Sequence, residues 1–277
     1  MNFVIRIFYQ LLILSSNLFA QQYLNEQLKT ADSLFNAEKY FDAITEYKRL
    51  LYFDSTKQFS FQANFKIGLA YKEGGKYSEA IKYFGLAEVN AINSEQIFES
   101  KIYQVRTNIL RMTVFRADKI LDELENDNRF AGHLKEIKYW KAWSKIFADE
   151  WEEAYHIFSQ INETKLARLC LNTQNKFYSV DFAKYSSMIF PGFGQFYTGE
   201  YISGLLSLGW NIFSGYLTIS AFNAERIFDG IVSANLLWFR FYRGNFQNAE
   251  KFAREKNISI TNETLQFLNE NFNGLKP

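Results

Sequence analysis

Nucleophilic and imidazole side chains are scarce in this 277-residue chain, which has two histidines, His133 and His156, and one cysteine, Cys170. His156 and Cys170 could act as a base and a thiol nucleophile, but such a pair also needs hydrogen-bond geometry and a third group that orients the base. The histidines lie 23 residues apart, and no second ligand stands at a metal-binding spacing from either. We therefore predict no catalytic residue and no metal site, and an enzyme is the third alternative.

The glycine-rich segment 191–199 is the next candidate for ligand chemistry. It matches neither a P-loop nor a dinucleotide fingerprint, because no Gly-Lys-Ser/Thr follows it. The carboxylates are scattered among lysines and arginines, as on a solvated surface, and the net charge of +1 creates no field that attracts nucleic acid. The sequence thus predicts no cofactor, no small-molecule substrate and no nucleic-acid partner.

The elements that would position any site are indicated by a period of 37 residues. Alanine recurs at this interval, and an aromatic or branched residue lies three before and four after each alanine. The alanines are Ala43, Ala80, Ala117 and Ala154. Positions i, i+3 and i+7 share one helical face, where the small alanine lets a second helix approach. A period of this size predicts stacked helical repeats, which are usually binding surfaces rather than catalysts.

A partner helix precedes each of these faces, and the pair has a recognisable pattern. The clearest pair reads Ile67-Gly68-x-x-Tyr71, a turn at Gly74-Gly75, and Tyr77-x-x-Ala80-x-x-x-Phe84-x-x-Ala87. This pattern resembles the tetratricopeptide repeat (TPR). The units around Ala43 and Ala154 also resemble it well, and the unit around Ala117 is degenerate. The resemblance implies an all-α, TPR-like solenoid of about four helix pairs over residues 23–172.

Two details follow from this resemblance. The family repeat has 34 residues, so each unit here carries three more, which we expect between helix pairs, at 54–57 and 90–95. In this family one face of the first helix of each pair lines a groove that takes an extended peptide or a partner helix. The transferred register predicts a partner-binding groove formed by Phe35, Phe65, Lys72, Arg106, Tyr139 and Trp143.

A different pattern covers residues 180–256. Ile202 to Phe222 is uncharged, and as a helix it would be about 31 Å long, close to the thickness of a bilayer core. A second apolar segment, 227–241, follows after four residues, which predicts an antiparallel helical hairpin. We expect residues 202–241 to contact a membrane and residues 257–277 to form a polar tail. The alternative is a soluble hairpin that packs on the last repeats.

The segment before this hairpin resembles the PGxGQxYxG motif of small bacterial membrane hairpins, which are related in pattern to the TM2 domain. Its motif residues are Pro191, Gly192, Gly194, Gln195, Tyr197 and Gly199. The resemblance implies that Gln195 and Tyr197 hydrogen-bond at the membrane interface. Downstream, Gly244-Asn245 followed by Phe246 and Ala249 predicts a turn into another repeat-type helix.

The positions of the basic residues are compatible with two arrangements of the hairpin in a membrane. Basic residues cluster after the second apolar segment, whereas the connection between the segments offers only Arg226. Because positive residues prefer the cytoplasmic side, either the second segment lies at the interface or this chain obeys the rule weakly.

The N-terminus predicts the compartment. Residues 1–20 have one cation, Arg6, an apolar run and a small residue, Ala20, as expected of a signal peptide, with an uncleaved anchor as the alternative. Together these patterns predict a non-enzymatic protein–protein interaction scaffold of the bacterial cell envelope, exported and held at the inner membrane facing the periplasm. The alternative is a soluble secreted protein of the same repeats.

Overall fold

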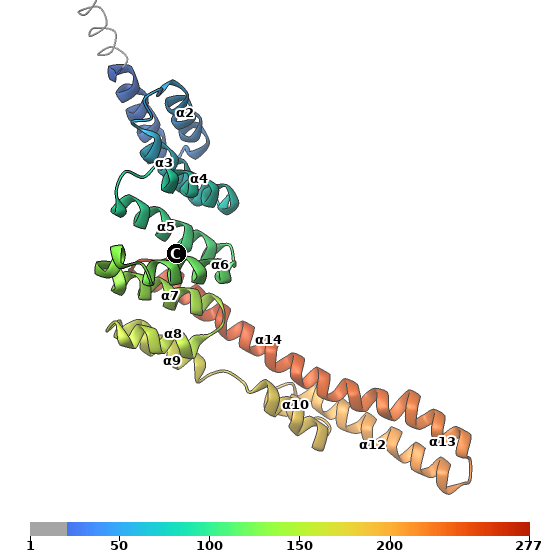
Figure 1. Ribbon diagram of the computed structural model, residues 1–277. Coiled ribbons are helices and arrows are strands. Elements are labelled where there is room, and N and C mark those ends of the chain that lie inside the picture. Colours follow the sequence, from blue (N-terminus) through green and yellow to red (C-terminus); the bar gives the residue numbers. More distant parts are fainter. Residues whose placement is uncertain (1–20) are drawn as a thin grey trace, which may run out of the picture. The chain divides into compact units, whose positions relative to one another are not determined.

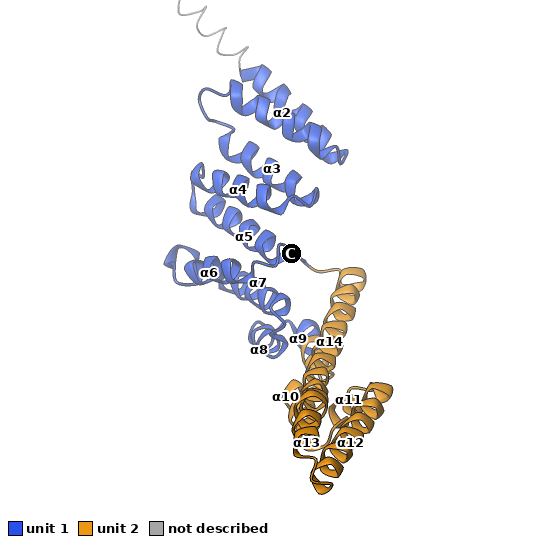
Figure 2. Ribbon diagram, turned by 90° about the vertical axis from the view of Figure 1, so that its right-hand side faces the viewer, with its two compact units in different colours: residues 1–168, 275–277 blue, residues 169–274 orange. Residues whose placement is uncertain are grey.

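The computed structural model describes residues 21–277, so the predicted signal peptide lies outside the described residues. The described residues form helices and no strand, which confirms the all-α, TPR-like fold. They divide into two compact units (Figures 1 and 2). One contains residues 21–168 together with Leu275–Pro277, and the other contains Leu169–Gly274.

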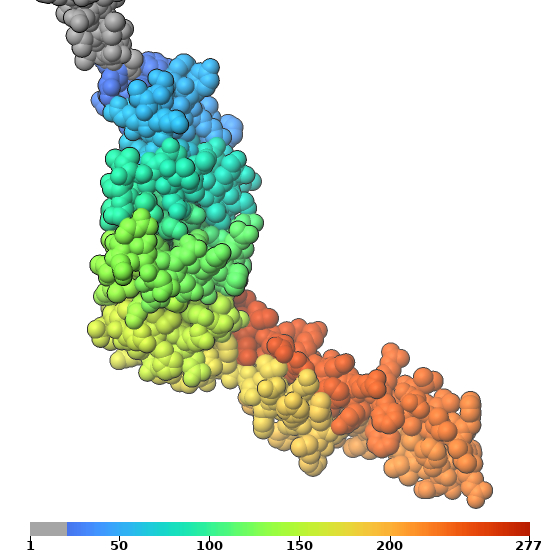
Figure 3. Space-filling view, viewed as in Figure 1, coloured from blue at the N-terminus to red at the C-terminus, as the bar shows by residue number. Residues whose placement is uncertain are grey.

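The first unit is a stack of helix pairs in chain order, as its colours in Figure 3 show. Residues 21–36 are helical and pair with α2. The later pairs are α3 with α4, α5 with α6 and α7 with α8, and a short 3-10 helix, η1, precedes α7. Their bounds are α2 Tyr40–Phe53, α3 Ser60–Glu73, α4 Tyr77–Val89, α5 Ser94–Leu110, α6 Val114–Glu125, η1 Asn128–His133, α7 Leu134–Phe147 and α8 Trp151–Gln160.

The 37-residue period corresponds to the core of this stack. All four alanines of the period are fully buried, and so are the aromatic or branched residues four positions later, namely Tyr47, Phe84, Leu121 and Phe158. Helices approach closely at these points. A Cβ atom at Gly68 of α3 would lie 2.7 Å from the ring of Phe84 of α4, so this crossing needs a glycine.

The turn inside each pair repeats with the same period. Its left-handed residues are Glu38 (φ 59°), Gly75 (φ 70°), Met112 (φ 62°) and Asp149 (φ 65°). In each turn the amide of the next residue donates to a carbonyl five residues back, as Lys76 does to Tyr71 at 2.8 Å. The turn geometry is therefore common to all four pairs, although only one of them has glycine at this position.

The extra residues of each unit are divided between two places. The connections 54–59 and 90–93 account for part of them, and α5 accounts for more, with 17 residues against 14 in α3 and α7. Asp54 organises the first connection, because its buried carboxylate accepts hydrogen bonds from the Phe59 amide at 2.6 Å and the Thr56 hydroxyl at 2.8 Å.

The second unit begins within α9 and contains a long helical hairpin. Helix α12 lies antiparallel to a continuous helical run made of α13, a π-helical turn η2, and α14 (Figure 1). The bounds are α9 Thr164–Gln174, α10 Val180–Ile189, α11 Phe193–Tyr197, α12 Tyr201–Asn223, α13 Ile227–Ser233, η2 Ala234–Trp238 and α14 Phe239–Asn271. The predicted turn at Gly244-Asn245 is wrong, since both residues lie inside α14.

Candidate functional site

Arg106, one of the predicted groove residues, is held by aromatic rings of the repeat array. Its guanidinium carbon lies 4.6 Å from the centre of the Tyr103 ring and 4.8 Å from that of Trp140. Such contacts attract a cation to the ring faces and fix the flat guanidinium group. Nη2 donates a hydrogen bond of 2.9 Å to the carbonyl of Lys276, whereas the buried Nε has no hydrogen-bond partner in the described part of the chain.

Tyr139 lies beside Arg106 on the next first helix, α7. Its ring contacts Trp140, Trp143 and Phe158, with centroids 5.2, 6.5 and 5.8 Å away. The hydroxyl donates a 2.5 Å hydrogen bond to the carbonyl of Leu275. Burial raises the pKa of Tyr139 above its ordinary value, so the hydroxyl keeps its proton and remains a donor at neutral pH.

Lys72 brings a second cation close to Arg106. Only 9% of its side chain is exposed, and its Nζ lies 3.6 Å from a carboxylate oxygen of Glu73. Burial, and then the charge of Arg106, lower the pKa of Lys72, because both disfavour its charged form. Two cations, Lys72 and Arg106, and the hydroxyl donor of Tyr139 therefore lie among aromatic rings of the array.

The two phenylalanines of the predicted groove lie in different surroundings. Phe65 is buried against Phe84 and Tyr103, at centroid distances of 5.4 and 5.0 Å, and so supports the ring under Arg106. Phe35 packs instead on Tyr40, with Lys66 over its ring at 5.2 Å. Ring contacts thus connect Phe65, Arg106, Tyr139 and Trp143 by way of Tyr103 and Trp140. Lys72 is near enough to Arg106 to feel its charge, and Phe35 packs elsewhere.

Tyr103 and Trp140 are the two rings beside Arg106 that the sequence prediction missed. They are 37 residues apart, and so are Arg106 and Trp143. The period found from the buried alanines therefore also applies to the groove face, and extending it to the first helices would have found both rings.

Cys170 and His133 are of residue types that often act in catalysis, but here they make packing contacts. Cys170 is fully buried, and burial raises the pKa of its thiol to about 12, so it is not a thiolate at neutral pH. His133 stacks on Phe98 at 4.0 Å and lies 3.2 Å from the Glu95 carboxylate. Within residues 21–277, no group of three or more His, Cys, Asp and Glu side chains is arranged to hold a metal ion.

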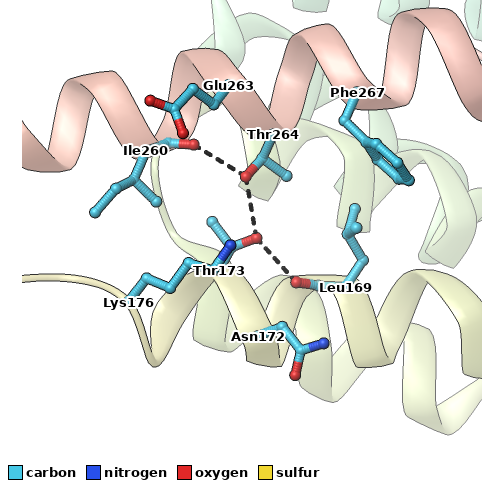
Figure 4. A pocket seen from close by; sticks show the side chains of 8 residues that line it. All are labelled: Leu169, Asn172, Thr173, Lys176, Ile260, Glu263, Thr264 and Phe267. Atoms are coloured by element: carbon cyan, nitrogen blue, oxygen red, sulfur yellow. Dashed lines mark hydrogen bonds between the residues drawn. The ribbon is translucent and has the colours of Figure 1, made fainter.

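A small pocket of about 270 Å³ lies between α9 and the C-terminal half of α14 (Figure 4). Two hydroxyls face each other in it, those of Thr173 and Thr264, 3.3 Å apart. Each also donates to a carbonyl of its own helix, that of Leu169 or Ile260. These two hydroxyls are therefore satisfied within the protein, and they connect the two helices that line the pocket.

The PGxGQxYxG motif forms a buried hydrogen-bond network. The amide of Gln195, which is fully buried, donates to the Asn245 carbonyl at 2.9 Å, and the Asn245 amide donates to the Ser187 carbonyl at 2.6 Å. The backbone amides of Gly192 and Gly194 donate to the Asn245 and Ser187 side chains. The bonds of Gln195 are therefore internal to the unit rather than directed to an interface, and they join α10, α11 and α14.

The motif glycines are explained by close contacts. A Cβ atom at Gly192, which has φ 94°, would lie 2.4 Å from the carbonyl oxygen of Gly204, and one at Gly194 would lie 2.1 Å from that of Ala183. Pro191 precedes this tight turn, and Gly199, with φ 79°, ends the motif before α12. The hydroxyl of Tyr197 accepts a 3.0 Å hydrogen bond from the Ser179 amide.

Comparison with known proteins supports one part of this description directly. The tetratricopeptide repeat family model matches residues 62–86, which belong to α3 and α4. No curated protein and no solved structure matches the chain. The matched unit is the one with the clearest motif in the sequence, and its geometry recurs in the neighbouring pairs. The α3–α4 unit therefore matches the tetratricopeptide repeat, and it lies within an all-α, TPR-like solenoid of helix pairs.

Proposed function

We propose that this protein is a non-enzymatic scaffold whose repeat array binds a partner protein or peptide, and whose α12–α14 hairpin holds the array at a membrane. The repeat supports the first half, because tetratricopeptide repeats generally bind proteins and are typically not enzymes. The distribution of polar residues on α12 supports the proposed role of the hairpin at a membrane.

Helix α12 buries its small and polar residues and exposes its large apolar ones. The buried residues are Gly204, Asn211, Ser214, Gly215, Thr218 and Ala221. The hydroxyls of Ser214 and Thr218 bond inside the hairpin, where that of Thr218 reaches the Ser233 hydroxyl at 3.1 Å. In water this arrangement is unfavourable, but in lipid small and polar residues belong at helix contacts and apolar residues at the surface.

The exposed side of the hairpin is extensively apolar. On α12, Ile202 is 78% exposed and Leu205 and Ile212 are each 63% exposed. Further exposed apolar residues are Leu206, Phe213, Tyr216, Ile219, Phe228, Ile231 and Leu236. Soluble monomers rarely expose apolar patches this large. Among the described residues one helix, α12, is long and apolar enough to cross a membrane, and only 28% of its most apolar stretch is buried.

Two arginines lie where the apolar surface ends on α14. Arg240 and Arg243 are exposed and, with Asn235 and Gln247, line a pocket of about 490 Å³. Cations beside an apolar face attract anionic lipid headgroups, at about 1 kcal/mol each near the surface. They support binding of the hairpin to a membrane that contains anionic lipid.

The compartment follows from the N-terminal pattern. Residues 1–20 would export the chain, and the array would then face the periplasm at the inner membrane of a bacterial envelope. N-terminal sequencing of the mature protein tests this step, and we expect it to begin at Gln21. A mature protein that retains Met1 would favour the uncleaved anchor.

Alkaline carbonate extraction followed by vesicle flotation tests the membrane role of the hairpin. We expect the full chain to remain with membranes after carbonate and to float with vesicles. The double variant Leu205→Lys/Ile212→Lys should be lost from the floating fraction, because each charge inside the bilayer costs about 3 kcal/mol. The matched control is Phe41→Lys/Phe115→Lys, which changes two exposed apolar residues of the array, each 81% exposed.

The control variant should float as the wild-type chain does. Recovery of the wild-type chain in the soluble fraction, at low and high salt, would contradict the membrane role. It would leave the soluble secreted repeat protein as the better description.

A further inference from the structure

The chain's own tail is hydrogen-bonded to two of the predicted groove residues of the array. Leu275–Pro277 belong to the same compact unit as the repeats. The Leu275 carbonyl accepts the hydrogen bond of Tyr139, 136 residues away in sequence, and the Lys276 carbonyl accepts that of Arg106, 170 residues away. Both donors are residues that the repeat register predicts for partner binding.

These two bonds recognise the main chain of the tail rather than a side chain. The acceptors are consecutive backbone carbonyls, and the residue Leu275 is 62% exposed. Residue 277 is a proline, which favours an extended conformation at Lys276. The groove therefore takes an extended segment whose carbonyl groups face the array, and it tolerates a range of side chains at the first of these positions.

The donors are held in place independently of the tail. Arg106 lies over the rings of Tyr103 and Trp140, and Tyr139 lies against Trp140 and Trp143. Without the tail, Nη2 of Arg106 and the hydroxyl of Tyr139 would lose the carbonyl acceptors they have in this structure. Donors left unpaired in a partly buried site are costly, so an array without the tail would favour another source of carbonyl oxygens.

We propose that residues Leu275–Pro277 are a resident ligand of the groove, and that an extended peptide of the partner competes with them for Arg106 and Tyr139. This inference rests on the proposed role of the groove as a binding surface. A tethered segment has an effective concentration on the order of millimolar, and the apparent affinity of a partner falls in proportion to the fraction of open groove. The tail would thus set a threshold for partner binding.

Photo-crosslinking of the full chain measures this occupancy. Leu275 is replaced by p-benzoylphenylalanine, which keeps the backbone carbonyl and uses an exposed side-chain position. We expect irradiation to join residue 275 to peptides of α5 or α7 within the same molecule, as identified by mass spectrometry. A crosslink pattern that avoids both helices would overturn the inference.

Two groove substitutions then test the named donors. In the photo-crosslinking chain, Arg106→Gln/Tyr139→Phe should lower the yield of the α5 and α7 crosslinks about tenfold, as expected when the occupied fraction falls to about a tenth. The matched control is Arg111→Gln/Tyr155→Phe, which makes the same chemical changes at an exposed arginine and at a tyrosine whose ring contacts His156. Equal yields in the two variants would show that these donors do not hold the tail.

Competition between a free peptide and the tail tests the proposal without any substitution in the array. A free octapeptide with the sequence of residues 270–277, added at several millimolar, should reduce the crosslink yield. The same peptide with the carbonyls of the residues equivalent to Leu275 and Lys276 reduced to methylene groups should not. If neither peptide competes, the tail is a fixed part of the array rather than a replaceable ligand. Such a result leaves the membrane role of the hairpin intact, since flotation tests that role separately.

Discussion

At the residue scale, the chemistry of this chain consists of hydrogen-bond donors held by aromatic rings rather than of reactive groups. Arg106 contributes a guanidinium group held between two rings, and Tyr139 contributes a hydroxyl that burial keeps protonated. Both point to carbonyl oxygens of residues 275 and 276. Recognition of a peptide main chain is therefore within the reach of the groove, whereas the buried thiol of Cys170 is unsuited to nucleophilic attack at neutral pH.

Cys170 gives a prediction at this scale. We expect the native thiol to react with a maleimide at least a hundredfold more slowly than the thiol of the chain in denaturant, because it is fully buried and protonated. Reaction at equal rates in the two states would contradict the placement of this side chain.

The same thiol predicts a pH dependence of stability. The pKa of the Cys170 thiol is raised from its ordinary value of 9.0 to about 12 in the folded chain. Because the folded pKa is raised, the stabilising contribution is complete below pH 9.0 and is lost as the pH rises through about 12. Urea denaturation from pH 8 upward should therefore show a smaller loss of stability for Cys170→Ala than for the wild-type chain. A parallel loss in both would contradict the raised pKa.

At the element scale, one helix-pair geometry is repeated with different residues. The left-handed turn recurs at Glu38, Gly75, Met112 and Asp149. The sequence showed this turn only where glycine marked it, at Gly75. Glu38 and Met112 are not typical of left-handed backbone, so the tertiary packing of the pairs determines their conformation.

Two glycines of the α3–α4 unit test the role of this turn. Gly75→Ala should lower the free energy of unfolding by about 1 kcal/mol, since alanine is strained at φ 70°. The matched change Gly85→Ala lies inside α4, where a new Cβ meets nothing within 4 Å, and should be neutral or stabilising by up to about 1 kcal/mol. Thermal unfolding followed by circular dichroism measures both, and equal effects would contradict the turn assignment.

The hairpin motif offers a second matched pair of glycines. Gly194→Ala would place a methyl group 2.1 Å from the Ala183 carbonyl oxygen and 2.7 Å from the Ala249 side chain, so we expect a loss of about 2 kcal/mol or more. Gly209→Ala on α12 meets nothing within 4 Å and should be tolerated. Protease resistance of the purified chain, compared between the two variants, measures the difference. Similar resistance would contradict close packing at the motif.

At the scale of the whole molecule, the sequence predicted the helices better than their joint arrangement. The period placed the starts of α2, α4, α6 and α8 because buried alanines and aromatics leave a strong periodic signal. It failed at Gly244-Asn245, where a local turn pattern lies inside α14 and the Asn245 side chain instead bonds to Ser187. Contacts between residues distant in sequence, such as Tyr139 with Leu275, leave no local pattern to find.

The central claim is that the exposed apolar face of the hairpin lies in lipid while the array remains in water. Its most direct test uses an environment-sensitive NBD fluorophore on single cysteines in a Cys170→Ala background, with the full chain in vesicles. Ile212→Cys places the probe on α12, and Phe115→Cys places it on an exposed residue of α6. We predict blue-shifted emission and quenching by lipids with brominated acyl chains at position 212, and neither at position 115. Water-like emission without quenching at both positions would contradict the membrane role.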